Sequence, residues 1–215
     1  MRALRGGGFA LGALGGELAR DGLTYAYVAV STMLAFCLFG YVLGRQADQL
    51  YELSSIDALT GLRNRRIAQE RLHEECARVE RYGGALALLL VDLDGLKAIN
   101  DRSGHRAGDL ALKRVAEAIR SGARGTDVAA RWGGDEFMVL VPSAGEGEAR
   151  HLAERIRAFA MEEVVAGGPA ITVSVGVAVA EPTVGPLAPE MLVRAADAAL
   201  YEAKRAGRNR VVVAR

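Results

Sequence analysis

Two groups of acidic residues in this chain stand where carboxylates from different segments could meet. Asp92 and Asp94 flank Leu93 at the end of an apolar run, and Asp135 and Glu136 follow a pair of glycines. Ligands of α/β proteins usually lie at the carboxyl ends of strands. Carboxylates that converge there suit a hard divalent cation such as Mg²⁺ or Mn²⁺, which prefers oxygen ligands. The sequence therefore predicts a metal site in which Asp92 and Asp135 lie close together.

Lysine is rare in this chain, and two lysines stand where they could neutralise phosphate groups. Lys97 comes just after the acidic run, and Lys204 precedes Arg208 by four residues, a spacing that would place both on one helix face. Mg²⁺ held by few carboxylates usually also binds substrate phosphates, and lysine and arginine bind phosphate as a point charge and a planar fork. A phosphorylated substrate is therefore expected. The chain lacks a GxxxxGK[ST] loop, which excludes a Walker-type NTPase.

Asn100 and Asp109 are residue types that can recognise a purine. An amide and a carboxylate together offer partners for O6 of guanine and for its N1 and N2 donors. Each candidate also has a purely structural interpretation. Asp94 and Asp101 could be solvated caps, and Asp109 could lie in the first turn of a helix. The two glycines could form only a turn, and the cations near residue 204 could complement a helix dipole.

The composition is that of a globular protein with balanced charge. Of 215 residues, 51% are hydrophobic and 25% are charged, and 27 basic residues face 26 acidic ones. These values exclude wholesale disorder and argue against a dedicated nucleic-acid-binding protein. Cys37 and Cys76 have no partner at disulfide-scaffold or zinc-ligand spacing. We therefore expect a reducing compartment for most of the chain.

The candidate residues lie between segments that alternate in pattern, which predicts an α/β fold with a mixed central sheet flanked by helices. The helices are expected at Leu62–Tyr82, Ala107–Arg120, Glu146–Val165 and Pro189–Ala206. The strands are expected at Ala85–Val91, Asp127–Trp132, Glu136–Val141, Ile171–Val179 and Arg210–Ala214. Gly133 and Gly134 should supply positive φ angles for a tight turn between two of these strands.

An uncharged segment precedes this domain. Residues 23–44 contain no charged side chain, and about 20 apolar residues suffice to cross a bilayer core of about 30 Å. We predict one transmembrane helix there, with a buried core helix as the alternative. Residues 1–22 are expected to form a short disordered or interfacial segment. A slight excess of arginine after the span places the C-terminal side in the cytoplasm.

Residues 45–55 join the predicted span to the domain. Their composition favours a helix, and Leu43, Leu50 and Leu53 could form an apolar seam that extends the membrane helix into a parallel coiled coil. A plain linker is the alternative, because fewer than two heptads are present.

Five separated motifs strongly resemble, in this order, the diguanylate cyclase (GGDEF-domain) family of bacteria. They are Asp57–Arg65 (DALTGLRNR), Asp92–Asp101 (DLDGLKAIND), Gly104–Asp109 (GHRAGD), Gly133–Phe137 (GGDEF) and Ala199–Asn209 (ALYEAKRAGRN). The resemblance implies a palm-like nucleotide-cyclase fold, preceded here by one transmembrane helix, over residues 56–215. It also implies condensation of two GTP molecules into cyclic di-GMP with release of two pyrophosphates. Each domain would supply one nucleotide, so the implied enzyme is a homodimer, here at the inner membrane.

Carried over position by position, the resemblance implies roles for individual residues. The Mg²⁺ (or Mn²⁺) ligands would be Asp92, the main-chain carbonyl of Leu93, Asp135 and Glu136. The catalytic group would comprise Asp135, Glu136 and Lys97, with the acid that accepts the 3′-hydroxyl proton left open. The substrate contacts would be Asn100 and Asp109 for guanine, His105 near the nucleotide, Gly133 and Gly134 for close backbone approach, and Lys97, Lys204 and Arg208 for the triphosphate. Leu96 replaces the aromatic residue usual before the lysine, which should alter affinity rather than abolish activity.

Arg124 and Asp127 form an RxxD pair shortly before the glycine pair. Many members of the family carry an inhibitory site for cyclic di-GMP at this place. At about 3.3 Å per strand residue, the pair would lie roughly 20 Å from the hairpin tip, so product bound there would not occupy the active site. A surface turn with an ion pair between the two side chains is the alternative.

Two classes of function fit these observations. One is an active, membrane-anchored cyclase, and the other is a non-catalytic receptor that binds cyclic di-GMP or GTP. The joint presence of Asp92, Asp135, Glu136, Lys97 and Lys204 favours the enzyme. A mononucleotide cyclase on the same fold is disfavoured by the expected need for two domains.

Overall fold

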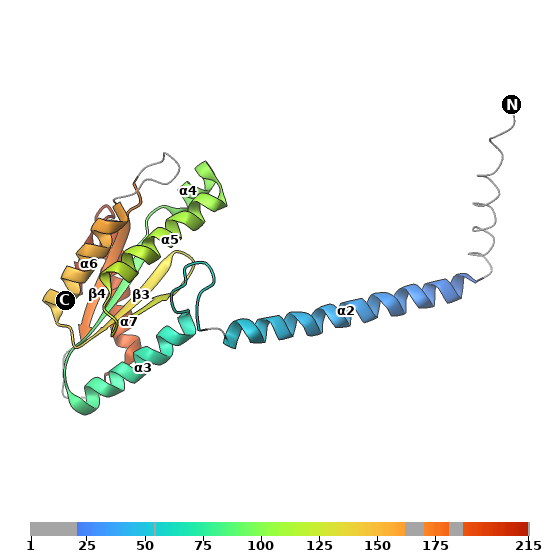
Figure 1. The fold of residues 1–215 in the computed structure, drawn as a ribbon, viewed down its shortest axis with the longest axis horizontal. Helices are drawn as coiled ribbons and strands as arrows, with labels where there is room; N and C mark the ends of the chain where they lie inside the picture. The colour runs from blue at the N-terminus through green and yellow to red at the C-terminus, as the bar shows by residue number, and fades with distance from the viewer. Residues whose placement is uncertain (1–20, 54, 162–169, 181–186, 215) are drawn as a thin grey trace. The chain divides into compact units, whose positions relative to one another are not determined.

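The chain divides into two compact units, residues 1–53 and residues 54–215. The computed structural model describes the backbone of residues 21–53, 55–161, 170–180 and 187–214, and the side chains of these residues except 46–53. In the first unit, helix α2 runs without interruption from Gly22 to Leu53 (Figure 1).

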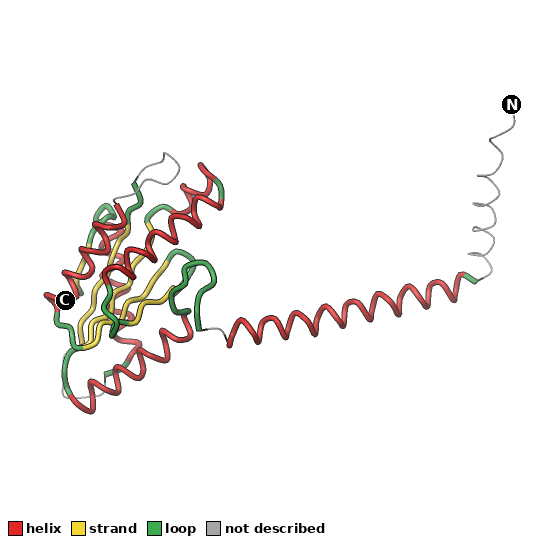
Figure 2. The backbone as a smooth tube through the Cα atoms, in the orientation of Figure 1, coloured by secondary structure: helices red, strands yellow, loops and turns green. Residues whose placement is uncertain are grey.

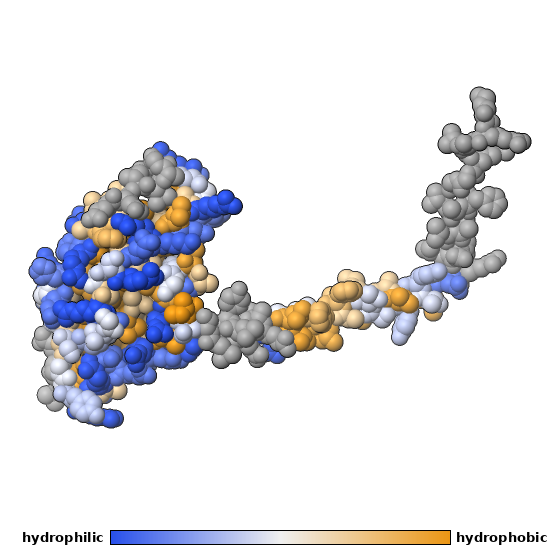
Figure 3. Space-filling view, viewed as in Figure 1, coloured by the Kyte–Doolittle hydropathy of each residue, from blue (hydrophilic) through white to orange (hydrophobic). Residues whose placement is uncertain are grey.

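Helix α2 carries an exposed apolar surface. Its stretch Gly22–Arg45 is long and apolar enough to cross a membrane and is not buried, and Figure 3 shows apolar side chains in orange along the helix. The predicted span 23–44 and most of the predicted linker 45–55 lie on this one helix. Most of the predicted segment 1–22 lies outside the described residues, as do the side chains of Leu50 and Leu53 on which the coiled-coil prediction depends.

The second unit is built on a five-stranded sheet with the order β2-β3-β1-β4-β5 (Figures 1 and 2). The strands are β1 (Leu86–Leu93), β2 (Val128–Arg131), β3 (Glu136–Pro142), β4 (Val173–Ala180) and β5 (Val211–Val213). Central β1 pairs antiparallel with β3 and β4, β2 pairs antiparallel with β3, and β5 runs parallel to β4. The predicted mixed sheet is confirmed.

Helices cover both faces of the sheet, which explains why every residue of β1 is buried. The α5 (His105–Gly122) and α6 (Glu146–Met161) helices pack in the same core cluster as Leu89 and Val91 of β1. The α3 (Arg65–Tyr82) and α7 (Pro189–Arg205) helices pack with the alternate residues of β1, Leu86, Leu88 and Leu90. Since side chains of a strand alternate between faces, the even-numbered end of β1, including Asp92, faces the α3 and α7 side.

The structure corrects several predicted element boundaries. A short helix that the sequence analysis missed, α4 (Leu96–Ser103), follows the acidic run. Helix α3 begins at Arg65 rather than Leu62, because the Asn64 side chain caps it by accepting a hydrogen bond from the Ile67 N–H at 3.1 Å. Leu62 instead packs in the core cluster of α5 and α6.

The end of α7 changes the expected placement of two cations. The helix stops at Arg205, and Gly207, Arg208 and Asn209 all have positive φ angles. Arg208 therefore does not share a helix face with Lys204, contrary to the prediction from their spacing. A left-handed turn, not the helix, positions Arg208.

The glycine pair of the hairpin also behaves differently from the prediction. Neither Gly133 nor Gly134 has a φ angle in the left-handed region. The N–H groups of Trp132 and Gly133 donate to the Glu136 carbonyl at 2.8 and 3.1 Å, so the connection is longer than two residues. Loops of four residues are usually built around a type I turn, which needs no positive φ at its central positions. What remains special is the open space around Gly134, where an added Cβ would meet nothing within 4 Å.

Close packing of α7 on β4 depends on Gly176. A Cβ at this position would stand 2.1 Å from the Ala196 carbonyl oxygen and 2.3 Å from the Leu200 nitrogen. These are backbone atoms, so Gly176→Ala should push α7 off the sheet and lower the free energy of unfolding by about 3 kcal/mol. Urea unfolding of the full chain in detergent, followed by the fluorescence of its one tryptophan, Trp132, measures the loss.

Gly147→Ala is the matched control, because the position is exposed on α6 and an added Cβ meets nothing within 4 Å. It should unfold no earlier than the unaltered chain, since alanine is the better helix former. Equal stability of the two variants would contradict this account of the α7–β4 contact.

Candidate active site

The two acidic strand ends are neighbours in the sheet. In the pairing of β1 with β3, Asp92 lies opposite Glu136, and the Leu93 N–H donates to the Asp135 carbonyl at 3.0 Å. Directly opposed residues of an antiparallel pair project their side chains from the same face. The sheet register therefore brings the two acidic segments side by side and sets the side chains of Asp92 and Glu136 on the same face.

A lysine already lies within this cluster. The Lys204 ammonium is 2.8 Å from Asp92 Oδ2, and only 8% of the Asp92 side chain is exposed. Burial raises the pKa of Asp92 to about 6; Lys204 opposes this rise, whereas the carboxylates of Asp135 and Glu136 add to it. The three acidic side chains thus carry more negative charge than the one ammonium of Lys204 can neutralise.

The donor set suits a hard divalent cation. Asp92, Asp135, Glu136 and the carbonyl of Leu93 offer only oxygen. Among the side chains that the structure describes, no three from histidine, cysteine, aspartate or glutamate lie close enough together to hold a metal ion. These ligands could therefore hold an ion only with further oxygens, such as those of a substrate phosphate.

Asn100 provides a buried acceptor on α4. Its side-chain oxygen is buried and accepts no hydrogen bond from the part of the chain that the structure describes. Helix α5 supplies the space for this side chain, since a Cβ on Gly108 would stand 2.0 Å from Asn100 Oδ1. Buried polar atoms in native proteins almost always have a partner. The orphaned oxygen therefore suits a ligand that brings its own N–H donor.

The other predicted contacts lie on the two helices that follow β1. Asp109 and His105 are exposed on the first two turns of α5, and Lys97 is exposed on the first turn of α4. Leu96, which stands where an aromatic residue was expected, packs against the core cluster of α5 and α6. The predicted site residues thus belong to the end of β1, to α4 and α5, to the β2–β3 hairpin, and to α7 with the turn that follows it.

Sequence analysis missed Arg131, which clamps the hairpin. Its guanidinium donates to the Gly134 carbonyl at 2.7 Å and to the Gly133 carbonyl at 3.2 Å. It also lies 3.4 Å from the carboxylate of Asp57, in the first of the five motifs. Only the folded chain joins these residues, which are 74 positions apart, so no local pattern could have revealed the contact.

The RxxD pair forms its turn by a contact that was not expected. Asp127 accepts a hydrogen bond from the Arg124 backbone N–H at 2.7 Å, while the Arg124 guanidinium reaches Glu148 of α6 at 3.4 Å. The pair borders a hollow of about 430 Å³ that His151 and Arg155 also line. The predicted alternative, an ion pair between the two side chains, is therefore not the contact that Arg124 makes.

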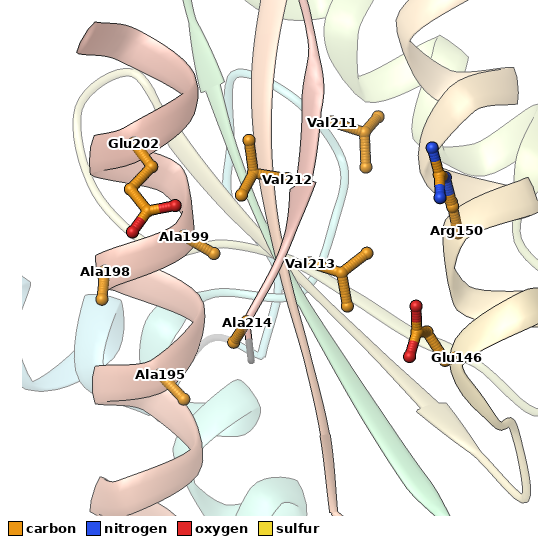
Figure 4. A pocket seen from close by; sticks show the side chains of 10 residues that line it. All are labelled: Glu146, Arg150, Ala195, Ala198, Ala199, Glu202, Val211, Val212, Val213 and Ala214. Carbon is orange, nitrogen blue, oxygen red and sulfur yellow. The ribbon is translucent and has the colours of Figure 1, made fainter. Parts of the chain in front are cut away.

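A groove larger than this hollow lies at the β5 edge of the sheet. It has a volume of about 740 Å³ and is bordered by α6, α7 and β5 (Figure 4). Its walls are mainly valine and alanine, with Glu146, Arg150 and Glu202 as the charged residues. None of the acidic cluster or of the Asn100 surroundings lines it, so we do not assign the chemistry to this groove.

Comparison with known proteins identifies the domain that carries this arrangement. A family model described as "Diguanylate cyclase, GGDEF domain" matches residues 54–210. The chain belongs to this family. Among curated proteins, it is 47% identical over 161 residues to diguanylate cyclase DgcP of Pseudomonas aeruginosa and 40% identical over 160 residues to diguanylate cyclase DosC of Escherichia coli. These matches cover 74% and 73% of this chain but only 24% and 34% of the two relatives.

Solved structures confirm the palm-like fold of the GGDEF domain. The GGDEF domain of DgcB from Caulobacter crescentus, in complex with c-di-GMP, superposes with a TM-score of 0.70 at 34% identity and covers 74% of this chain and 92% of that one. Diguanylate cyclase SiaD of Pseudomonas aeruginosa, in complex with its activator SiaC, gives a TM-score of 0.70 at 34% identity and covers 96% and 80%.

The contact between Asp57 and Arg131 predicts a pH-dependent contribution to stability. Burial favours the neutral acid, but hydrogen bonds from Thr60 and the charge of Arg131 outweigh it and lower the pKa of Asp57 below 3.8. A lowered pKa stabilises the folded state above the unfolded pKa, and this stabilisation is lost as pH falls through the folded pKa. Asp57→Asn should therefore lower the free energy of unfolding by about 1 kcal/mol at pH 7 and by less at pH 3, where the carboxyl group of the unfolded chain is mostly protonated.

Urea unfolding of the full chain at both pH values measures this difference. Asp197→Asn, at an exposed position on α7, serves as the control and should behave like the unaltered chain at either pH. An Asp57→Asn deficit that is the same at pH 3 as at pH 7 would show that the ionised carboxylate is not the stabilising species.

Proposed function

We propose that this protein is a diguanylate cyclase that condenses two GTP molecules into cyclic di-GMP and releases two pyrophosphates. The observation that carries the proposal is that the segment following β1 joins an acidic cluster at Asp92 to a buried, unpartnered acceptor at Asn100. The first suits a metal-bound triphosphate, and the second suits the N–H edge of guanine. The curated relatives described above are themselves diguanylate cyclases.

Mg²⁺ or Mn²⁺ would be held by Asp92, Asp135, Glu136 and the main-chain carbonyl of Leu93. This assignment is supported by the all-oxygen donor set and by the excess of negative charge over the single ammonium of Lys204. When bound, the ion would neutralise charge on the phosphate oxygens of the substrate.

The protein's own cations would bind the triphosphate. Lys204 is held at the end of β1 by Asp92, so its charge is fixed in place rather than spread through solvent. Lys97 and Arg208, both exposed, would bind further phosphate oxygens. Positioned charges of this kind are the main source of rate enhancement in phosphoryl transfer, where the transition state spreads negative charge over oxygens.

Guanine recognition would fall to the helical pair α4 and α5. The Asn100 oxygen would accept from a ring or amino N–H, and the Asp109 carboxylate would accept from another. His105 lies on the same helix as Asp109 and would approach the nucleotide. Gly133 and Gly134 would let the substrate come close to the hairpin backbone, and either Asp135 or Glu136 would accept the proton of the 3′-hydroxyl group.

The reaction requires two copies of this domain. Each copy would bind one GTP, whose 3′-hydroxyl would attack the α-phosphate of the GTP in the other copy and displace pyrophosphate. Two such attacks close the ring, which calls for a two-fold symmetric homodimer. Helix α2 would serve this need by holding two chains in one membrane, since tethering raises the effective concentration of the partner. We place the protein in the inner membrane as a single-pass protein, with residues 56–215 in the cytoplasm, and we assign it no nucleic-acid partner.

Product would also bind at the RxxD pair and inhibit the enzyme. Arg124 and Asp127 lie on the turn before β2, the strand that leads to the catalytic hairpin. The neighbouring hollow contains Arg155, a second guanidinium that suits a phosphodiester or a guanine edge. Binding of cyclic di-GMP would have to displace the contact of Arg124 with Glu148, which is weak because both side chains are more than half exposed.

The full chain in detergent micelles, incubated with GTP and Mg²⁺, should release pyrophosphate and form cyclic di-GMP at a rate per enzyme that rises with enzyme concentration. Asp135→Ala should reduce this rate by at least about 100-fold, because it removes a carboxylate from the charge-stabilising cluster. EDTA should abolish turnover, and Asp197→Asn, exposed on α7, should leave the rate unchanged.

Other outcomes would select other functions. Binding of GTP or cyclic di-GMP without turnover, in chains shown to be dimeric, would favour the non-catalytic receptor. A cyclic mononucleotide formed at a rate per enzyme that is independent of enzyme concentration would instead indicate a mononucleotide cyclase.

The proposed feedback makes a separate prediction. Cyclic di-GMP added to the unaltered chain should inhibit turnover, and Arg124→Ala should keep the uninhibited rate while raising the inhibitory concentration at least about 10-fold, the expected loss for a charge-assisted contact. Arg150→Ala, an exposed arginine on α6 outside this hollow, is the control. Equal inhibition of the unaltered chain and Arg124→Ala would contradict the site.

A further inference from the structure

We infer that Asp94 is a positioning residue that fixes the turn bearing Arg208, and that it is not a metal ligand; the inference rests on the proposed function. Asp94 directly follows Asp92 and Leu93, which are proposed to bind the metal. Its position in the sequence alone would suggest a further metal ligand or a solvated helix cap. Its observed contacts indicate a different role.

The carboxylate of Asp94 is occupied by donors from two other segments. Oδ1 accepts from Ser174 Oγ at 2.7 Å, and Oδ2 accepts from Thr172 Oγ1 at 2.9 Å and from the Asn209 backbone N–H at 3.1 Å. A carboxylate has about four lone-pair positions. Three are filled here by the chain itself, which leaves little capacity for a metal ion.

The turn that Asp94 contacts is conformationally demanding. Arg208 and Asn209 are consecutive non-glycine residues with φ angles of 63° and 45°, and Gly207 before them has a φ of 110°. Such conformations persist only where surrounding contacts enforce them. Besides Asp94, the turn is held by Arg157 of α6, whose guanidinium donates to the Asn209 side chain at 3.0 Å.

The two aspartates at the end of β1 therefore have different roles. Asp92 and Asp94 are two residues apart, and both meet the C-terminal end of α7 or the turn that follows it. Asp92 binds the Lys204 ammonium, and Asp94 binds the backbone just after Arg208. A displaced turn would move the Arg208 guanidinium away from the phosphates that it is proposed to bind, while the carboxylates of the metal site would stay in place.

Asp94→Asn tests the inference, because it keeps the side-chain volume but removes the negative charge and one accepting oxygen. The Asn209 N–H, which can only donate, then loses its charge-assisted acceptor. In the full chain in detergent, we expect the KM for GTP to rise about 10-fold, with kcat changed far less, as for loss of a contact made equally in the ground and transition states. The Mg²⁺ concentration for half-maximal rate should not change. Arg208→Ala should give the same KM, and the double variant should be no worse than either single one.

Three further measurements keep the result decisive. Calorimetric binding of 3′-deoxy-GTP, which lacks the nucleophile, should weaken about 10-fold in Asp94→Asn. Thr172→Val removes one donor without touching the turn and should show a smaller change in KM in the same direction. Asp197→Asn should match the unaltered chain in every assay.

The possible contradictions are distinct. A multiplicative double variant, or a shifted Mg²⁺ requirement with unchanged KM, would overturn the positioning role. The positioning role would also be overturned if the Asp94→Asn chain failed to fold and the Thr172→Val chain had an unchanged KM for GTP. Absence of 3′-deoxy-GTP binding to the unaltered chain would instead refute the proposed function, whereas equal binding by the unaltered chain and Asp94→Asn would refute this inference alone.

Discussion

The excess of negative charge at the end of β1 is the constraint on which the rest of the domain depends. Asp92 is almost fully buried, and the acids of the neighbouring strand end raise its pKa further. A buried carboxylate is costly unless a cation accompanies it. Lys204 meets part of this need from α7, and Gly176 lets that helix approach β4 closely enough to deliver it. The negative charge that remains would favour binding of a metal ion together with the phosphate groups that the ion coordinates.

The hairpin that carries Asp135 and Glu136 is tied to the start of the domain as well as to the sheet. Arg131 holds the carbonyls of Gly133 and Gly134 with one side of its guanidinium and meets Asp57 with the other. Thr60 lies in the same turn as Asp57, and its backbone carbonyl accepts a hydrogen bond from the Arg120 side chain of α5. The segment that comes soon after α2 in the sequence is therefore bonded to the hairpin that carries the acids. Movement of that segment would reach the hairpin through the Arg131 side chain and through the backbone hydrogen bonds that join Arg63 to Ala129 and Arg131.

Much of this architecture was predictable, because its signals are local. The buried run before Asp92 indicated a central strand, and the apolar spacing of the later segments indicated helices. Errors came where local patterns compete. The acidic run concealed α4, whose eight residues are too few to show a clear period. The four-residue spacing of Lys204 and Arg208 suggested one helix face, but three consecutive left-handed residues end that continuity.

The sequence by itself determined the family, the order of elements and the chemical types gathered for the site, since motif spacing and side-chain chemistry are properties of the chain. Only the tertiary structure decided which partners each acid contacts. Asp92 and Asp94 look equivalent in the sequence. In the folded chain, Asp92 lies opposite Glu136 in the sheet and binds the ammonium of Lys204. Asp94 instead accepts hydrogen bonds from Ser174, Thr172 and Asn209. Those partners lie about 80 or more residues away in the chain, and hydrogen bonds at such separation exist only once strands and helices have packed.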